Sequence, residues 1–147
     1  MRIPHLRVPT PEITGLSDLR VLLADDSQVT QLVTGDLLSR LGIKPRIVGN
    51  GAQALELAFA DDFDVILMEV EMPVMDGIVA TNRLREFESA NPSRKRVPVV
   101  AYTKGQTSQA EAVLLRVGMD AVLEKPCGVL AMIGCLHRVC ASKLAVH

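Results

Sequence analysis

The sequence contains no tryptophan, and aromatic residues make up only 3% of its 147 residues. A flavin or another large planar cofactor would therefore find little aromatic surface on which to stack. The chain also lacks a Gly-x-Gly-x-x-Gly motif after its first apolar segment, and it lacks a phosphate loop ending in Gly-Lys-Ser or Gly-Lys-Thr. These absences argue against a flavodoxin-like or nucleotide-binding enzyme.

Cysteine is scarce, with three residues at positions 127, 135 and 140. The number is odd, no Cys-x-x-Cys pair occurs and no histidine lies at metal-ligand spacing, so neither a disulfide framework nor a zinc site is supported. The chain also has no apolar run long enough to span a membrane and no signal peptide. We therefore expect a cytoplasmic protein with reduced, partly buried cysteines.

The chain has no strong excess of either charge, because 16 basic residues face 17 acidic ones. A net charge of −1 gives no reason to expect binding to nucleic acid or to an anionic membrane. The one basic cluster, Arg94-Lys95-Arg96, is interpreted as a solvated loop. Hydrophobic residues make up 48% and charged residues 22%, as is ordinary for one globular domain of this length.

Short apolar segments alternate with segments of helical periodicity along the chain. Strands are expected at 20–24, 45–48, 65–68, 97–102 and 121–123, and helices at 27–41, 52–60, 77–90, 107–117 and from just after Pro126 to about 141. Ser27 is the expected N-cap of the first helix, and Gly42 and Gly118 are expected to end helices. This alternation predicts an α/β fold, a doubly wound parallel sheet of five strands with five helices on both faces.

The apolar periodicity also predicts which side of each helix is buried. The first helix is expected to bury Val29, Leu32, Val33, Leu37, Leu38 and Leu41, the fourth Ala110, Val113, Leu114 and Val117, and the last Val129, Leu130, Ile133, Leu136 and Cys140. The N-terminus is interrupted by three prolines and lacks periodicity. We expect residues 1–18 to form a flexible arm, 19–142 the domain and 143–147 a C-terminal tail.

Residues with reactive side chains follow the expected strands. Asp25 and Asp26, Glu69, Thr103 and Lys125 each come at or just after the end of a strand, and the carboxyl ends of parallel strands share one edge of a sheet. Carboxylates about 5 Å apart repel by roughly 3 kcal/mol at an effective dielectric constant near 20, so such a cluster needs a cation. Mg²⁺ held by oxygen ligands and the lysine ammonium are both able to supply it.

The stretch from Asp64 to Gly77, Asp-Val-Ile-Leu-Met-Glu-Val-Glu-Met-Pro-Val-Met-Asp-Gly, resembles the phosphoacceptor segment of response-regulator receiver domains. Together with the residues at the other strand ends, the resemblance covers residues 20 to about 140. It implies the strand order 2-1-3-4-5. It also implies that Thr103 and Lys125 contact a phosphoryl group, and that Mg²⁺ is held by the residue at position 69 and by three further groups: the Asp25 and Asp26 carboxylates and the Glu71 backbone carbonyl.

The sequence departs from the family pattern at three positions, and these departures limit which functional properties of the family can be inferred for it. Glu69 stands where the family has the phosphorylated aspartate, and its extra methylene displaces the attacking oxygen from in-line geometry. Lys104 follows Thr103 where a small residue is usual, and it either neutralises Glu69 in place of metal or points to solvent. Val122 replaces the usual aromatic switch residue, with Tyr102 as a neighbour in sequence that could share that surface.

The resemblance implies a receiver domain of two-component or phosphorelay signalling rather than an enzyme. One hypothesis is a natural pseudo-receiver that is deficient in phosphorylation, binds Mg²⁺ weakly or not at all, and acts through protein contacts. The alternative is an ordinary Mg²⁺-dependent phosphoacceptor with an engineered, phosphomimetic or inactivating aspartate-to-glutamate change at position 69. Expected partners are a histidine kinase, a histidine phosphotransfer protein or an effector, and the chain is expected to be a monomer or a weak dimer through the face of its last two helices and last strand.

Overall fold

The computed structural model describes residues 15–105 and 108–144 of the chain. Within them the strands are β1 (Val21–Ala24), β2 (Arg46–Val48), β3 (Val65–Met68), β4 (Val99–Thr103) and β5 (Ala121–Glu124). The helices are α1 (Gln28–Arg40), α2 (Gly51–Ala60), α3 (Gly77–Ala90), α4 (Ser108–Arg116) and α5 (Val129–Val139). Strands and helices alternate, as the sequence pattern predicts.

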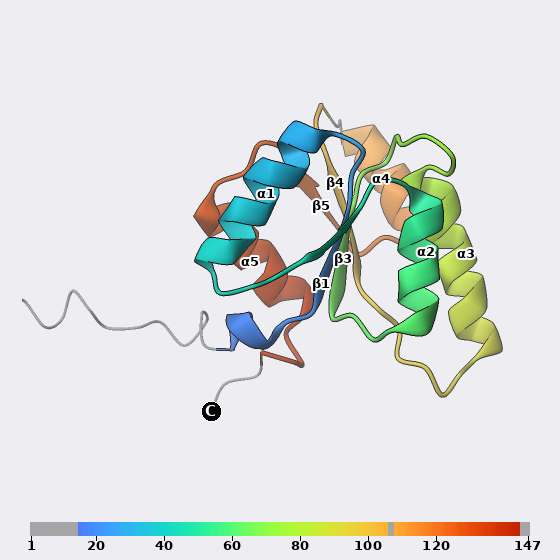
Figure 1. Ribbon diagram of the computed structural model, residues 1–147. Helices are drawn as coiled ribbons and strands as arrows, with labels where there is room; N and C mark the ends of the chain where they lie inside the picture. The colour runs from blue at the N-terminus through green and yellow to red at the C-terminus, as the bar shows by residue number, and fades with distance from the viewer. Residues whose placement is uncertain (1–14, 106–107, 145–147) are drawn as a thin grey trace, which may run out of the picture.

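The five strands form one parallel sheet in the order β2-β1-β3-β4-β5. Helices α1 and α5 cover one face of the sheet, and α2, α3 and α4 cover the other (Figure 1). This is the doubly wound arrangement that right-handed crossovers produce. The expected fold class and the expected strand order are both confirmed.

The core consists of two apolar layers because side chains alternate along each strand. Leu23 and Leu67 pack toward α1 and α5, where they meet Leu38 and Leu136. The intervening strand residues pack toward α2, α3 and α4, in a cluster that includes Leu22, Ile66, Ala54, Leu84 and Leu114. The central strands β1, β3 and β4 are buried along their whole length, as strands covered on both faces must be.

Local capping fixes where the helices begin and end. The Ser27 hydroxyl accepts a hydrogen bond from the Thr30 amide at 3.2 Å, which confirms Ser27 as the N-cap of α1. Gly42 and Gly118 follow α1 and α4 with φ values of 83° and 113°, in the left-handed region that glycine adopts without strain. Asp76 caps α3 through the Val79 amide at 2.8 Å.

The two ends of the described part of the chain pack more closely than the sequence suggests. Residues 16–18 form a short 3-10 helix, and Leu16 and Leu19 lie in the core at 2% and 4% exposure. Residues 1–14 of the expected arm lie outside the described residues, but the part from residue 15 onward belongs to the domain. The expected tail from residue 143 likewise contributes Leu144, which is 3% exposed.

The expected buried side of α1 is wrong over its first two turns. Val29, Leu32 and Val33 are 70%, 76% and 58% exposed, whereas Leu38 and Thr34 are buried. The apolar residues of the N-terminal half point away from the sheet, so the six predicted residues do not share one side of the helix.

The expected buried sides of α4 and α5 need smaller corrections. In α4 Leu114 is buried but Val113 is 45% exposed, and the side chain of Ala110 lies outside the described ones. In α5 Leu136 and Cys140 are buried as expected. Leu130 is 83% and Val129 38% exposed, so the prediction is wrong for the first turn of α5.

Candidate functional site

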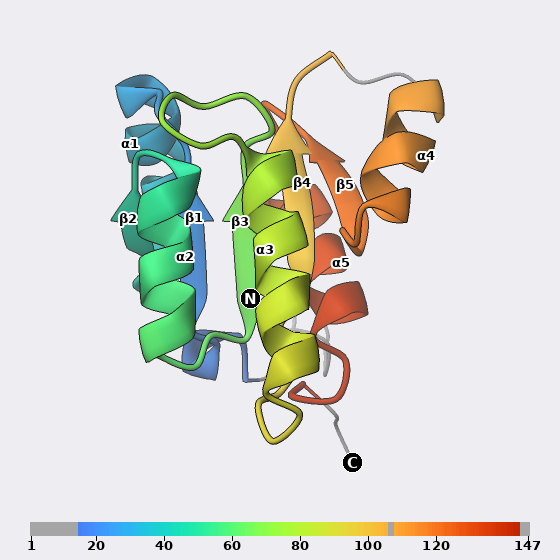
Figure 2. The ribbon, with the colours of Figure 1, turned by 90° about the vertical axis from the view of Figure 1, so that its right-hand side faces the viewer.

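The strand register places the candidate site residues side by side. Ala24 pairs with Met68, so the residues that follow them, Asp25 and Glu69, are neighbours at the carboxyl ends of β1 and β3. Thr103 ends β4 and pairs with Glu124, which brings Lys125 to the same edge. In Figure 2 this edge is at the top of the sheet, where the loops to α3 and α4 begin.

The Lys125 side chain lies between two carboxylates. Its Nζ donates to Asp25 Oδ2 at 2.7 Å and to Glu69 Oε1 at 2.6 Å. The side chains of Lys125, Asp25 and Glu69 are 9%, 1% and 11% exposed, so this ion triplet is largely removed from water. The structure thus joins β1, β3 and the end of β5 through one ammonium group.

The remaining carboxylate oxygens of the triplet accept hydrogen bonds from backbone amides. Asp25 Oδ1 accepts from the Ser27 amide at 2.9 Å, and Glu69 Oε2 accepts from the Val70 amide at 2.8 Å. Each of the four carboxylate oxygens therefore already has one donor. Buried charges are tolerated when their lone pairs are satisfied in this way.

The environment keeps Glu69 ionised and Lys125 protonated. Burial alone would raise the pKa of Glu69, but hydrogen bonds from Lys125, Thr103 and the Val70 amide, together with the Lys125 charge, outweigh it and lower the pKa below 4.5. Burial alone would lower the pKa of Lys125, but its hydrogen bonds to Asp25 and Glu69 outweigh that effect and raise the pKa above 10.5. Glu69 and Lys125 are therefore both charged throughout the neutral range.

Three other residues named from the sequence lie at the rim of the site. Asp26, Glu71 and Lys104 are exposed, and Lys104 makes no ion pair with Glu69 among the described residues. Lys104 and Glu71 instead line a cleft of about 360 Å³ beside Thr103, whose walls come from α3, α4 and the loop after β3. Of the two alternatives for Lys104, the structure agrees with the one in which it points to solvent.

Tyr102 lies on the other side of the sheet from the surface it was expected to share with Val122. Its hydroxyl bonds to Thr34 Oγ1 of α1 at 2.8 Å, and its ring packs with α1 and α5. Val122 packs with the cluster beneath α2, α3 and α4. Tyr102 therefore does not replace the aromatic switch residue, because side chains one position out of phase on adjacent strands face opposite sides.

The carboxylates do not form a ready magnesium site. Mg²⁺ requires several oxygen ligands in near-octahedral geometry, and no group of three His, Cys, Asp or Glu side chains converges suitably in the described part of the chain. A divalent ion about 4 Å from the Lys125 ammonium would be repelled by roughly 8 kcal/mol at an effective dielectric constant near 20. In this arrangement the residues fit the ammonium and not the metal.

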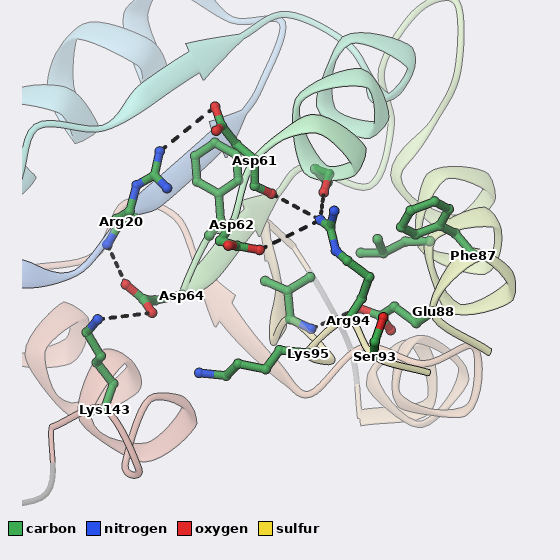
Figure 3. Close-up of a pocket in the computed structure, with 14 residues that line it drawn as sticks. Arg20, Asp61, Asp62, Asp64, Phe87, Glu88, Ser93, Arg94, Lys95 and Lys143 are labelled. Carbon is green, nitrogen blue, oxygen red and sulfur yellow. Dashed lines mark hydrogen bonds and ion pairs between the residues drawn. The ribbon is translucent and has the colours of Figure 1, made fainter. Parts of the chain in front are cut away.

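A second cavity lies at the opposite edge of the sheet, away from these residues. It measures about 450 Å³ and lies between the α2–β3 loop, the end of α3 and Lys143 (Figure 3). Arg94 in its wall donates to the backbone carbonyls of Ala58, Phe59 and Asp61 and lies 5.5 Å from the Phe87 ring centroid. Arg94 thus stabilises the end of α2, which corrects its assignment to a solvated basic loop.

Arg96 of the same basic cluster is also paired, because it donates to Asp120 Oδ1 at 2.7 Å. Lys95 is exposed, as expected. Among the described helices, none is both long enough and apolar enough to cross a bilayer. Cys135 and Cys140 are buried free thiols and Cys127 is half-buried, in agreement with the expected core cysteines.

Comparison with known sequences identifies the family of this arrangement. The sequence model of the response regulator receiver domain matches residues 21–136. Two-component response regulator 24 of Arabidopsis thaliana is 33% identical over 124 residues, which cover 84% of this chain and 85% of that protein. Several other relatives are histidine kinases, and the chain spans only 3% to 15% of their length.

Solved structures show the same fold. The receiver domain of the sensor histidine kinase PA1611 from Pseudomonas aeruginosa, which has a magnesium ion coordinated in its active-site cleft, is 30% identical with a TM-score of 0.72. The match covers 84% of this chain and 98% of that one. The receiver domain of Ssk1 from Saccharomyces cerevisiae, crystallised with the histidine phosphotransfer protein Ypd1, has a TM-score of 0.80 at 24% identity over 86% of this chain and 91% of that one.

Proposed function

The chain belongs to the response regulator receiver family, and we propose that it is a pseudo-receiver, a signalling module that acts through protein contacts without being phosphorylated at Glu69. The observation that carries the proposal is the Glu69 side chain, whose two carboxylate oxygens are held by Lys125 at 2.6 Å and by the Val70 amide at 2.8 Å. A nucleophilic oxygen must instead face the incoming phosphoryl group in line with the leaving oxygen.

Glutamate occupies space that a phosphoryl group would need. Its carboxylate reaches the Lys125 ammonium directly, and Thr103 also hydrogen-bonds it. These two side chains are the ones that the family resemblance pairs with a phosphoryl group. The single negative charge of Glu69 stands in for the roughly two charges of a phosphoryl group at neutral pH, so the chain holds a partial imitation of the phosphorylated state.

Phosphorylation with acetyl phosphate and Mg²⁺, followed by intact-mass spectrometry, tests this proposal. The chain as it stands is expected to gain no phosphoryl group, because Glu69 is engaged and displaced from in-line geometry. Glu69→Asp is expected to gain one, since the shorter side chain withdraws from Lys125. Phosphoryl transfer to the unaltered chain, mapped to Glu69, would overturn the proposal and favour an ordinary phosphoacceptor.

The α1 patch, formed by Val29, Leu32 and Val33, is the surface that we propose for contact with a partner. These three apolar side chains are more than half exposed on successive turns, although their helix has a buried side available. A helix of a histidine kinase or a histidine phosphotransfer protein would cover such a stripe by helix-to-helix packing. Histidine kinases appear among the relatives, and a histidine phosphotransfer protein is the partner in the Ssk1–Ypd1 complex.

Two lysine substitutions distinguish the α1 patch from the alternative face built on α4, β5 and α5. Leu32→Lys is expected to weaken binding to a histidine phosphotransfer protein from the same organism at least tenfold, because a desolvated contact becomes charged. Val113→Lys makes the same change on α4, where the side chain is 45% exposed, and is expected to leave this binding unaltered. The reverse pattern in calorimetric titration would assign the contact to the α4 face.

A further inference from the structure

We infer that the Lys125 ammonium occupies the place of the divalent cation in this chain, so that Mg²⁺ does not bind at the carboxyl edge of the sheet. The inference deepens the proposed function and rests on it for its signalling meaning. It concerns a different measurable property, namely metal binding and not phosphoryl transfer.

The ammonium bridges the two carboxylates that a metal ion would need. Nζ lies 2.7 Å from Asp25 Oδ2 and 2.6 Å from Glu69 Oε1, on strands that are direct neighbours in the sheet. The Glu69 side chain completes this bridge because it reaches the lysine that also contacts Asp25. The oxygens that remain are taken by the Ser27 and Val70 amides.

Lys125 is also held in position by its surroundings. Its backbone amide donates to the Thr103 carbonyl at 2.9 Å, which continues the pairing of β5 with β4. Its ammonium lies 5.6 Å from the centroid of the Tyr102 ring, and that ring is fixed by the hydrogen bond of its hydroxyl to Thr34. Displacing the ammonium would expose two buried carboxylates to each other, so metal entry must disrupt several contacts together.

The remaining acidic groups do not replace Asp25 and Glu69 as ligands for a metal ion. Asp26 and Glu71, which would complete a metal site, are exposed at the rim, and no three acidic side chains converge among the described residues. One positive charge therefore crosslinks β1, β3 and β5 without a metal. The consequence is a receiver in which Lys125 holds Asp25 and Glu69 together at the carboxyl edge of the sheet. The structure of this edge does not respond to the Mg²⁺ concentration.

Magnesium titration of the full chain, followed by amide NMR shifts, tests the inference. The unaltered chain is expected to show no saturable shift at residues 25, 26 and 69 in millimolar Mg²⁺. Lys125→Met keeps an unbranched side chain one atom shorter than lysine and removes the charge, and it is expected to bind Mg²⁺ at least tenfold more tightly. Lys104→Met removes the same charge from a neighbouring exposed lysine and is the matched control, for which no gain is expected.

Saturable binding by the unaltered chain, or an equal gain in Lys104→Met, would overturn the inference. If Lys125→Met does not fold, the Nζ signal of Lys125 in the unaltered chain provides a second measurement. Its protons are expected to exchange slowly and to keep their shifts when Mg²⁺ is added, whereas a metal-induced change contradicts the bridge. Phosphoryl uptake at Glu69 would reject the proposed function in a separate assay, so the two failures are distinguishable.

Discussion

Glu69→Gln is the perturbation that measures the strength of the ion triplet. Glutamine has nearly the same volume, and its amide oxygen is able to keep the hydrogen bond from the Val70 amide. Its NH2 group then faces Lys125, so the change removes both the negative charge and the acceptor of the Lys125 hydrogen bond. A hydrogen bond to a charged group contributes about 1.5–3 kcal/mol to stability. Lys125 keeps Asp25 at 2.7 Å, so the cost stays below the 3–5 kcal/mol expected for an ion left without a partner.

We therefore expect Glu69→Gln to lower the free energy of unfolding by about 2 kcal/mol at neutral pH, and the Tm by roughly 6 °C in a domain of this size. Urea unfolding followed by circular dichroism measures the difference. Glu86→Gln, the same chemical change at an exposed position of α3, is the control and is expected to stay within about 0.5 kcal/mol of the unaltered chain.

The pH dependence separates the charge effect from a packing effect. Because the folded state lowers the pKa of Glu69 below 4.5, its stabilisation is complete above that pH and is lost as the pH falls through the folded pKa. The difference in the free energy of unfolding between the unaltered chain and Glu69→Gln is therefore expected to become smaller in acid. The contribution of Lys125, whose pKa is raised above 10.5, is lost only as the pH rises through that folded pKa. The reasoning would be refuted if Glu69→Gln lowered the free energy of unfolding at pH 7 by no more than the Glu86→Gln control does. It would also be refuted if the loss caused by Glu69→Gln were the same in acid as at pH 7.

Two further predictions concern packing and thiol chemistry. Gly77→Ala is expected to destabilise the fold by about 2 kcal/mol, because its Cβ would overlap the backbone carbonyl oxygen that follows β3. Gly134→Ala, whose Cβ meets nothing within 4 Å, is expected to stabilise the fold by about 0.5–1 kcal/mol, since glycine is unfavourable inside a helix such as α5. Thermal unfolding in which the Gly77→Ala variant is the more stable of the two would contradict this prediction. Iodoacetamide is expected to modify Cys127 first, since Cys135 and Cys140 are 2% and 3% exposed and burial raises the pKa of Cys140 to about 12; intact mass showing fast double or triple labelling of the native chain would contradict the buried positions.

The fold was predictable because strands and helices differ in period and length. The short apolar runs at 65–68 and 121–123 are bounded by acidic residues, glycine or proline, and such boundaries leave no room for a helix. The strand order came from the family resemblance, since periodicity does not determine which strands are neighbours. The convergence of Asp25, Glu69 and Lys125 was predictable once parallel strands were assumed, because their carboxyl ends share an edge.

The pairing within the site was only partly predictable. The sequence suggested either metal or lysine as the neutralising cation, and it offered Lys104 as well as Lys125 for that role. Only the strand register places Lys125 Nζ within 2.7 Å of both carboxylates, whereas Lys104 is exposed. A choice between neighbouring lysines depends on distances of a few ångströms, which residue spacing does not encode.

The wrong prediction of the buried side of α1 has a different origin. The apolar pattern in its sequence is real, but the apolar residues face two surfaces, the core of the domain and the exposed α1 patch. Thr34 faces the core because its hydroxyl bonds to the buried Tyr102 hydroxyl at 2.8 Å, and this polar contact orients the helix. Val29, Leu32 and Val33 are then turned outward, where burial within the domain is not available to them. A helix that places a threonine in the core and three large aliphatic residues in water is stabilised further when a partner covers the outward side. The error in predicting α1 therefore supports the same conclusion as the proposed α1 patch, because apolar periodicity reports burial in a complex as readily as burial in a core.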